Sequence, residues 1–175
     1  NTGYTQTWGI TDWLVPANTF SLFGTPAQVA GEVANAAGAV LSADWELRDL
    51  IMRPRYPVKP WDWATATPDF VIPGAVTQTE SLEWTEKPAY TVVYVSGVQN
   101  GVLGQVKITG TAGDLPAPMV PQISLPILPA TGVIDLCKLI EFNDGNTTRR
   151  GIVRANSINV NWPTVRQTLT VEAAA

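Results

Sequence analysis

From residue 81 onward, apolar and polar residues alternate along the chain with the two-residue period of β-strands. Candidate strands, rich in Val, Ile, Thr and Tyr, are residues 81–84, 89–98, 101–110, 132–142, 150–160 and 164–173. The residues that share one face in the last two of these are Ile158, Val160 and Trp162, and then Val165, Leu169 and Val171. Asn- and Gly-containing turns at 99–101 and 143–146, and "NWP" at 161–163, separate them, because Asn and Gly tolerate positive φ. The pattern predicts antiparallel sheets with a barrel-like or sandwich-like arrangement.

One earlier segment has helical periodicity instead. In "TPAQVAGEVANAAGA", Val29 and Val33 fall on one face, Thr25 is suited to the N-cap, and Pro26 is suited to the first helical position. Gly38 supplies the C-terminal stop, so a helix over about 25–37 is predicted. The small residues at 30, 31 and 34 would let this helix lie close against a sheet, where a leucine at 31 or 34 would overpack the contact.

The segment "PRYPVKPWDW", residues 54–63, fits neither pattern. Each proline fixes its own φ and disfavours the helical region for the preceding residue, so an extended, semi-rigid rod is predicted. The rod could be a binding platform, a strut between parts of an assembly, or a plug in the protein's own core. The residues that we assign as candidates for packing or for a subunit interface are Arg55, Tyr56, Trp61 and Trp63, with Trp8 and Trp13 from the N-terminal region.

These elements predict an α+β fold that is mainly antiparallel β, with a small α/β piece carrying one helix. Within its 175 residues we expect an aromatic-rich arm over 1–24, a small α/β part over 25–87 and an antiparallel β part over 88–175. The three parts could also form one compact unit. Because the chain starts at Asn1 rather than at a methionine, we expect it to be a fragment of a longer protein.

Composition narrows the possible functions. Charged residues make up 15% of the chain, below the roughly 25% of a typical soluble domain, so we expect neighbouring subunits to cover part of the surface. The net charge of −4 argues against sequence readout of nucleic acid. No apolar run is long enough to predict a membrane span.

The residue types in the sequence give little support for catalysis. The chain has no histidine, which removes the commonest general base and metal ligand. Its single cysteine, Cys137, lies in an apolar run and is interpreted as a small buried hydrophobe. The acidic residues between 44 and 86 are numerous enough that some pair is expected by chance. We therefore predict a non-enzyme, with no catalytic, cofactor-binding or metal-binding residue and no cofactor.

The seven tryptophans of the chain leave carbohydrate binding as an alternative function. Flat aromatic rings stack on sugar faces, so a carbohydrate-binding β module with exposed tryptophans is the alternative, and a glycan would then be its partner. The interpretation that we favour places the tryptophans in the core and interfaces of a β assembly.

Several blocks of sequence, taken together, indicate a resemblance to a known family. "PRYPVKPWDW", "VSG" followed by "GTAGDLPAP", and the closing "RGIVR" and "VRQTLTVE" resemble hub-like tail proteins of long-tailed bacteriophages and prophages. The resemblance covers most of the chain from about residue 25 onward. It implies a structural protein of the virion tail, at the tail tip or baseplate, where the tail tube meets the receptor-binding apparatus.

The resemblance also implies partners. A homo-oligomer, with a trimer favoured, and other tail proteins are expected, and assembly would take place in the cytoplasm of the bacterial host. Under this reading the rod acts as a strut. Its conformational entropy is largely lost before assembly, and its rings offer a large area to bury.

Overall fold

A computed structural model of the chain describes residues 3–15, 17–18, 21–44, 46–77, 79–81, 92–99, 102–109, 121–143 and 147–173. They fold into two compact units, Asn1–Pro57 and Val58–Ala175, and the boundary falls inside the proline-rich rod. Strands predominate, and the described residues contain one α-helix. The prediction of a mainly antiparallel α+β fold is therefore confirmed, with two parallel pairings, β1–β3 and β4–β9.

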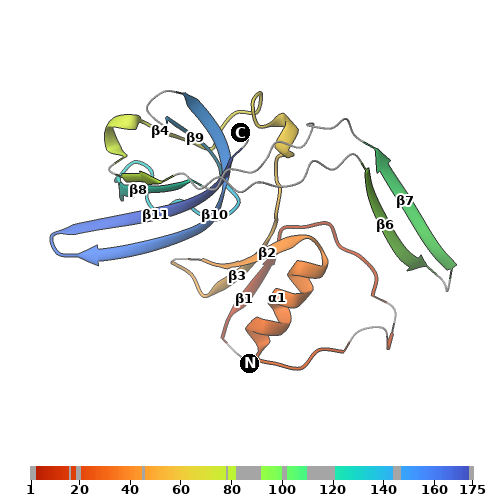
Figure 1. Cartoon of the computed structure of the whole chain (residues 1–175). Helices are drawn as coiled ribbons and strands as arrows, with labels where there is room; N and C mark the ends of the chain where they lie inside the picture. The colour runs from red at the N-terminus through yellow and green to blue at the C-terminus, as the bar shows by residue number, and fades with distance from the viewer. Residues whose placement is uncertain are drawn as a thin grey trace. The chain divides into compact units, whose positions relative to one another are not determined.

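The first unit is a three-stranded sheet with a helix (Figure 1). Its strands are β1 (Thr5–Trp8), β2 (Ala39–Ala43) and β3 (Asp49–Pro54), and its helix is α1 (Pro26–Ala36). The order in the sheet is β1-β3-β2, with β1 parallel and β2 antiparallel to β3. β1 therefore forms one edge of this sheet.

Local signals in the sequence define both ends of α1. The Thr25 hydroxyl accepts a hydrogen bond from the backbone N–H of Gln28 at 3.4 Å, and the Gln28 side chain accepts from the N–H of Thr25 at 2.9 Å. This capping box satisfies N–H groups that have no partner inside the helix. Gly38 follows the last turn at φ +68°, a conformation that glycine adopts without strain. The predicted helix and its caps are confirmed.

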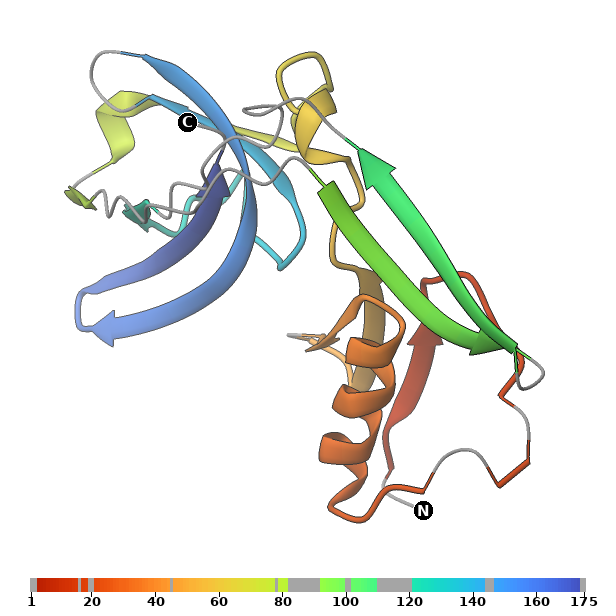
Figure 2. The ribbon, with the colours of Figure 1, turned by 45° about the vertical axis from the view of Figure 1, so that its right-hand side comes forward.

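The helix lies along the three-stranded sheet (Figure 2). Its contact with the sheet is made through small side chains. Ala34 of α1, Ala39 of β2 and Met52 of β3 are each about 1% exposed and form the centre of this core. The partly buried residues around them are Ile10, Ala30, Val33, Ala37 and Leu41. Gly31 differs from Ala34, because a Cβ at its position would meet no atom within 4 Å. Close packing therefore constrains residue 34 and leaves space at residue 31.

The second unit contains a six-stranded sheet in the order β4-β9-β10-β11-β8-β5 and a separate two-stranded sheet, β6-β7. The strands are β4 (Phe70–Ile72), β5 (Thr79–Ser81), β6 (Val92–Gln99), β7 (Val102–Thr109), β8 (Gln122–Pro126), β9 (Leu139–Asn143), β10 (Thr148–Asn161) and β11 (Thr164–Ala173). β4 and β5 end the larger sheet, so its described strands form an open sheet and not a closed barrel.

The predicted turns connect antiparallel pairs. Gln99 of β6 lies opposite Val102 of β7, Asn143 of β9 opposite Thr148 of β10, and Asn161 opposite Thr164 in the β10–β11 hairpin. Residues 82–84 and 89–91 of the predicted strands, and the turn residues 100–101 and 144–146, lie outside the described residues.

One face of the six-stranded sheet carries the main core. Its buried members are Ile72, Ile123, Leu125, Ile134, Ile140, Phe142, Val153, Leu169, Val171 and Ala173. Neighbouring residues on β9 and β10 point the other way: Leu139 and Ile152 belong to a second cluster. β9 and the part of β10 that pairs with it are therefore buried on both faces, and each has two consecutive buried apolar residues: Leu139 and Ile140 in β9, Ile152 and Val153 in β10.

A buried amide ties the loop before β9 to this sheet. Gln167 of β11 is fully buried, and its side-chain oxygen accepts hydrogen bonds from the N–H of Ile134 at 3.0 Å and from the Asn156 amide at 3.1 Å. Its side-chain nitrogen donates to the carbonyl of Gly132 at 3.1 Å. The loop thus satisfies a polar group that would be costly to bury without partners.

Two sequence predictions are corrected. The strand predicted over 132–142 begins only at Leu139, because the chain turns before it, with Cys137 at φ +63° and its N–H donating to the carbonyl of Val153. The rod is not extended throughout: Pro60–Asp62 forms a 3₁₀ turn with proline at its first position. The interpretation of Cys137 as a small buried residue is confirmed.

The packing of α1 yields a paired prediction. Ala34→Leu should lower the free energy of unfolding by about 1–3 kcal/mol, because the added methylenes have no space between α1 and the sheet. Gly31→Ala, the matched control, should instead raise it by up to about 1 kcal/mol, since alanine is the better helix former and its Cβ meets open space. Chemical denaturation followed by circular dichroism measures both changes. Equal stability of the two variants would contradict this account of the helix contact.

Candidate functional site

The part of the rod that belongs to the second unit, together with residues 64–69, lies on the second face of β9 and β10. On this face Leu139 is directly opposite Ile152, and Glu141 is directly opposite Arg150. The two cross-strand pairs thus place an apolar contact beside an ion pair. The segment from Val58 to Asp69 contacts both the apolar pair and the ion pair.

Trp63 provides the apolar contact. Its side chain is 2% exposed and clusters with Leu139 and Ile152, with Val58 and Ala66 partly buried beside it. The indole N–H donates to the carbonyl of Val58 at 3.0 Å, so its polar atom is satisfied. Trp63 is therefore a plug in the core of its own unit, the third of the roles considered for the rod.

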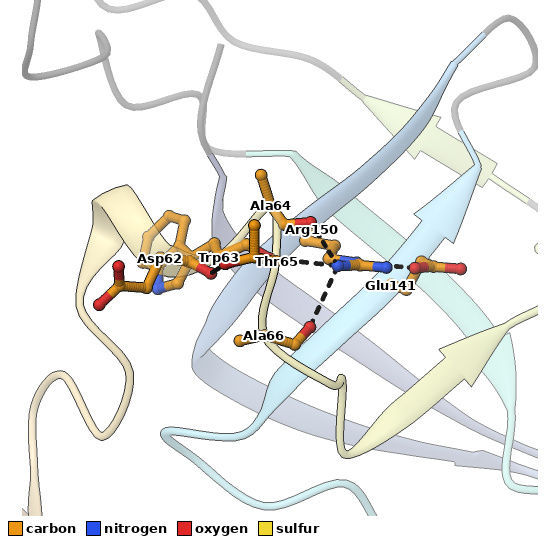
Figure 3. Close-up of polar contacts among 7 residues, drawn as sticks. All are labelled: Asp62, Trp63, Ala64, Thr65, Ala66, Glu141 and Arg150. Carbon is orange, nitrogen blue, oxygen red and sulfur yellow. Dashed lines mark hydrogen bonds and ion pairs between the residues drawn. The ribbon is translucent and has the colours of Figure 1, made fainter.

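The Arg150 side chain binds the backbone carbonyls of the same segment (Figure 3). Its Nη1 donates to the carbonyls of Ala64 at 2.7 Å and Ala66 at 3.1 Å, with a longer contact of 3.4 Å to that of Trp63. Its Nε donates to Glu141 at 2.7 Å, an ion pair whose side chains are 28% and 21% exposed. A planar guanidinium with five donors can serve both groups of acceptors at once.

Asp69 fastens the end of the segment where it enters β4. The carboxylate accepts from the N–H of Leu139 at 2.9 Å, and the N–H of Asp69 donates to the Leu139 carbonyl at 2.8 Å. Lys138 Nζ lies 3.2 Å from the same carboxylate. Together with Trp63 and Arg150, Asp69 fixes the path of residues 63–69 over the sheet.

Trp61 lies on the 3₁₀ turn two residues before the buried Trp63 and is 63% exposed. The ammonium of Lys59 lies 5.8 Å from the centre of its ring, within the range of a cation–π contact. Trp61 is thus exposed to solvent on a segment that the burial of Trp63 holds in place.

An open hollow of about 440 Å³ lies beside the anchored segment. Its lining residues are Trp63, Ala64, Glu141, Thr147, Thr148, Arg149 and Arg150. Because Arg150 is held by Glu141 and by backbone carbonyls, it supports the wall of the hollow. Among the described residues, no group of three or more Cys, Asp or Glu side chains is placed to hold a metal ion.

The other candidate residues belong to the first unit. Trp8 and Trp13 are each 39% exposed, with ring centroids 5.5 Å apart. Tyr56 is half-exposed and Arg55 is exposed, with the N–H of Arg55 donating to the carbonyl of Gly38. The six candidates thus divide between two units, and the interface role assigned to them stays a prediction.

Sequence reasoning missed Arg150 and Glu141, which fix the segment. The turn at 143–146 was a usable signal, because a hairpin centred there places residue 141 opposite residue 150 on one face. What the sequence could not supply was the set of carbonyl acceptors, since they come from residues more than 80 positions away.

No protein-family model matches this sequence, and no curated protein sequence is similar to it. A solved structure with a similar fold is the tail protein from Neisseria meningitidis MC58. The two share 9% sequence identity at a TM-score of 0.59, over 96% of this chain. The chain spans 61% of the length of that protein. The similarity is one of fold.

No helix in the described part of the chain has the length and apolar character needed to cross a membrane.

The two tryptophans of the anchored segment should respond oppositely to truncation. Trp63→Ala should lower the free energy of unfolding by about 3–5 kcal/mol, because it empties a buried site. Trp61→Ala, the control of the same residue type, should leave it within about 0.5 kcal/mol of the parent, since its ring is exposed. Thermal and denaturant unfolding measure the difference. Comparable losses in the two variants would mean that the segment packs differently.

The Arg150 contacts predict the stabilities of a second pair of variants. Arg150→Met should cost about 1–3 kcal/mol of stability, because the carbonyls of residues 64 and 66 and the Glu141 carboxylate lose their donor. Glu141→Gln should cost less, because an amide oxygen can still accept from Arg150 Nε. Denaturant unfolding gives both values, and a larger loss in Glu141→Gln than in Arg150→Met would contradict this account of the Arg150 contacts.

Proposed function

We propose that this chain is a structural, non-enzymatic component of a bacteriophage or prophage tail. The observation that carries the proposal is the similarity of fold to the tail protein from Neisseria meningitidis MC58 over 96% of the chain. The sequence blocks that resemble hub-like tail proteins support the same assignment. The absence of histidine and the low share of charged residues favour a structural role over a catalytic one.

The finer proposal places the chain at the tail tip or baseplate hub. There it would link the tail tube to the receptor-binding apparatus through contacts between subunits, as part of a homo-oligomer for which the resemblance favours a trimer. Large exposed apolar side chains support an assembled state. Examples are Trp162 at 88%, Phe23 at 95% and Leu14 at 89% exposure.

Locating the chain in particles tests this function. Antibodies raised against the purified chain should label tails released from the bacterium that encodes it, at the end distal to the head, in negative-stain electron microscopy. Mass spectrometry of purified tails should detect the chain at a constant ratio to the tube protein. Label confined to heads, or tails that lack the chain, would exclude the proposal.

Carbohydrate binding is the second candidate, and the exposed ring of Trp61 is the observation that favours it. Trp63, two residues further on, is buried and cannot belong to such a surface. Calorimetric titration with bacterial surface glycans should show saturable heat that is lost in Trp61→Ala if this function is correct. The structural role predicts no binding heat for either protein.

A further inference from the structure

The β10–β11 hairpin extends past the core that covers its base (Figure 1). Leu169 and Val171 of β11 are buried in that core, and Val165 lies on the same face because side chains alternate along a strand. Val160 is directly opposite Val165 and shares this face. Yet Val160 is 69% exposed, and Trp162 at the turn is 88% exposed. The face that packs the core at the base of the hairpin is uncovered at its end.

None of the described strands covers the outer edge of β10 there. β9 pairs with β10 only from Thr148 to Ile152. The Val165 carbonyl accepts from the N–H of Ile127, so it points away from β10, and its partner Val160 must direct its own N–H and C=O toward the open edge. Residues 157–161 carry no charge and no proline, the usual protection of exposed edges. An edge of this kind is suited to a partner.

A complementary surface lies on the first unit. It consists of the half-exposed rings of Trp8 and Trp13, here called the Trp8–Trp13 patch, and the exposed Asp12 carboxylate, which accepts from the N–H of Trp13 at 2.9 Å. β1, which carries Trp8, is an edge strand. The N–H of Thr5 donates to the carbonyl of Arg48 and the N–H of Gly9, just after β1, to that of Met52, so the backbone polar groups of Gln6 and Trp8 point outward.

Charge favours contact between these two surfaces. Residues 1–57 hold five carboxylates against three arginines, a net charge of −2, whereas residues 156–168 hold a single charged residue, Arg166. Arg166 is exposed and directly follows Val165, so its side chain leaves the hairpin end on the face opposite to Val165. The hairpin end thus offers apolar side chains, a free edge and a cation. The Trp8–Trp13 patch offers aromatic rings, a free edge and an anion.

We propose that the end of the β10–β11 hairpin docks on the Trp8–Trp13 patch of a second copy of this chain. Val160, Trp162 and Val165 cover the two rings on one face of the hairpin end, and Arg166 pairs with Asp12 from the other face. Because the two surfaces differ, the contact is heterologous and leaves each copy with one further free surface, so a ring forms when the rotation between copies closes. The inference rests on the proposed function, since it names the partner and the contact of the assembly expected there.

Sedimentation equilibrium of the purified chain, from micromolar to millimolar concentration, tests the contact. The parent mass should rise with concentration, and Trp162→Ser should weaken association about tenfold or more, the range of an interface anchor. Val71→Ser is the control: Val71 is 57% exposed on β4 of the same sheet and lies outside both surfaces. It should associate like the parent. Unchanged thermal unfolding of both variants ensures that the fold is intact.

Charge reversal identifies the second surface. Arg166→Asp and Asp12→Lys should each weaken association, and the double variant should recover most of the loss. Failure of the double variant to recover would overturn the pairing of hairpin and patch, as would a parent that stays monomeric throughout. A monomeric chain that still occurs in purified tails would overturn the docking inference alone. A chain that associates as described but is missing from tails would overturn the proposed function alone.

Discussion

Burial on both faces of β9 and of the part of β10 paired with it is the constraint on which the second unit depends. One face must be covered by the main core, and the other needs cover that no other strand of the sheet supplies. The chain meets this need with a single aromatic side chain, Trp63, and with an arginine that binds the backbone beside it. The cost of placing Arg150 and Glu141 next to an apolar cluster is offset because each satisfies the other. The path of the proline-rich segment follows from this arrangement.

The elements that the sequence predicted well are those whose signals are local. The α1 helix carries its N-cap, its first-turn proline and its terminal glycine within 14 residues, and the antiparallel hairpins carry their own turns. The parallel pairing of β1 with β3 joins residues more than 40 positions apart, and no local pattern indicates it. Trp61 and Trp63 show the same limit on a smaller scale. Two tryptophans separated by one residue have opposite environments, because a 3₁₀ turn, and not an extended rod, orients them.

The proposed tail function places opposite demands on two parts of the protein. Assembly contacts require exposed apolar side chains, whereas a soluble precursor must avoid non-specific association. The anchoring of residues 63–69 and the packing of α1 keep the large side chains Trp63 and Met52 out of solvent. What is left exposed, such as the hairpin end and the Trp8–Trp13 patch, lies at edges of sheets, where geometry restricts which partner can fit.

The buried amide of Gln167 has a consequence for how the second unit opens. The N–H of Ile134 belongs to a loop but donates to a side chain that is fully buried. Its exchange with deuterium therefore requires β11 to separate from that loop, an event as rare as disruption of the core itself. An amide in an irregular segment would then report the unfolding free energy of the second unit, and the loop from Gly132 to Lys138 would open together with the core of that unit.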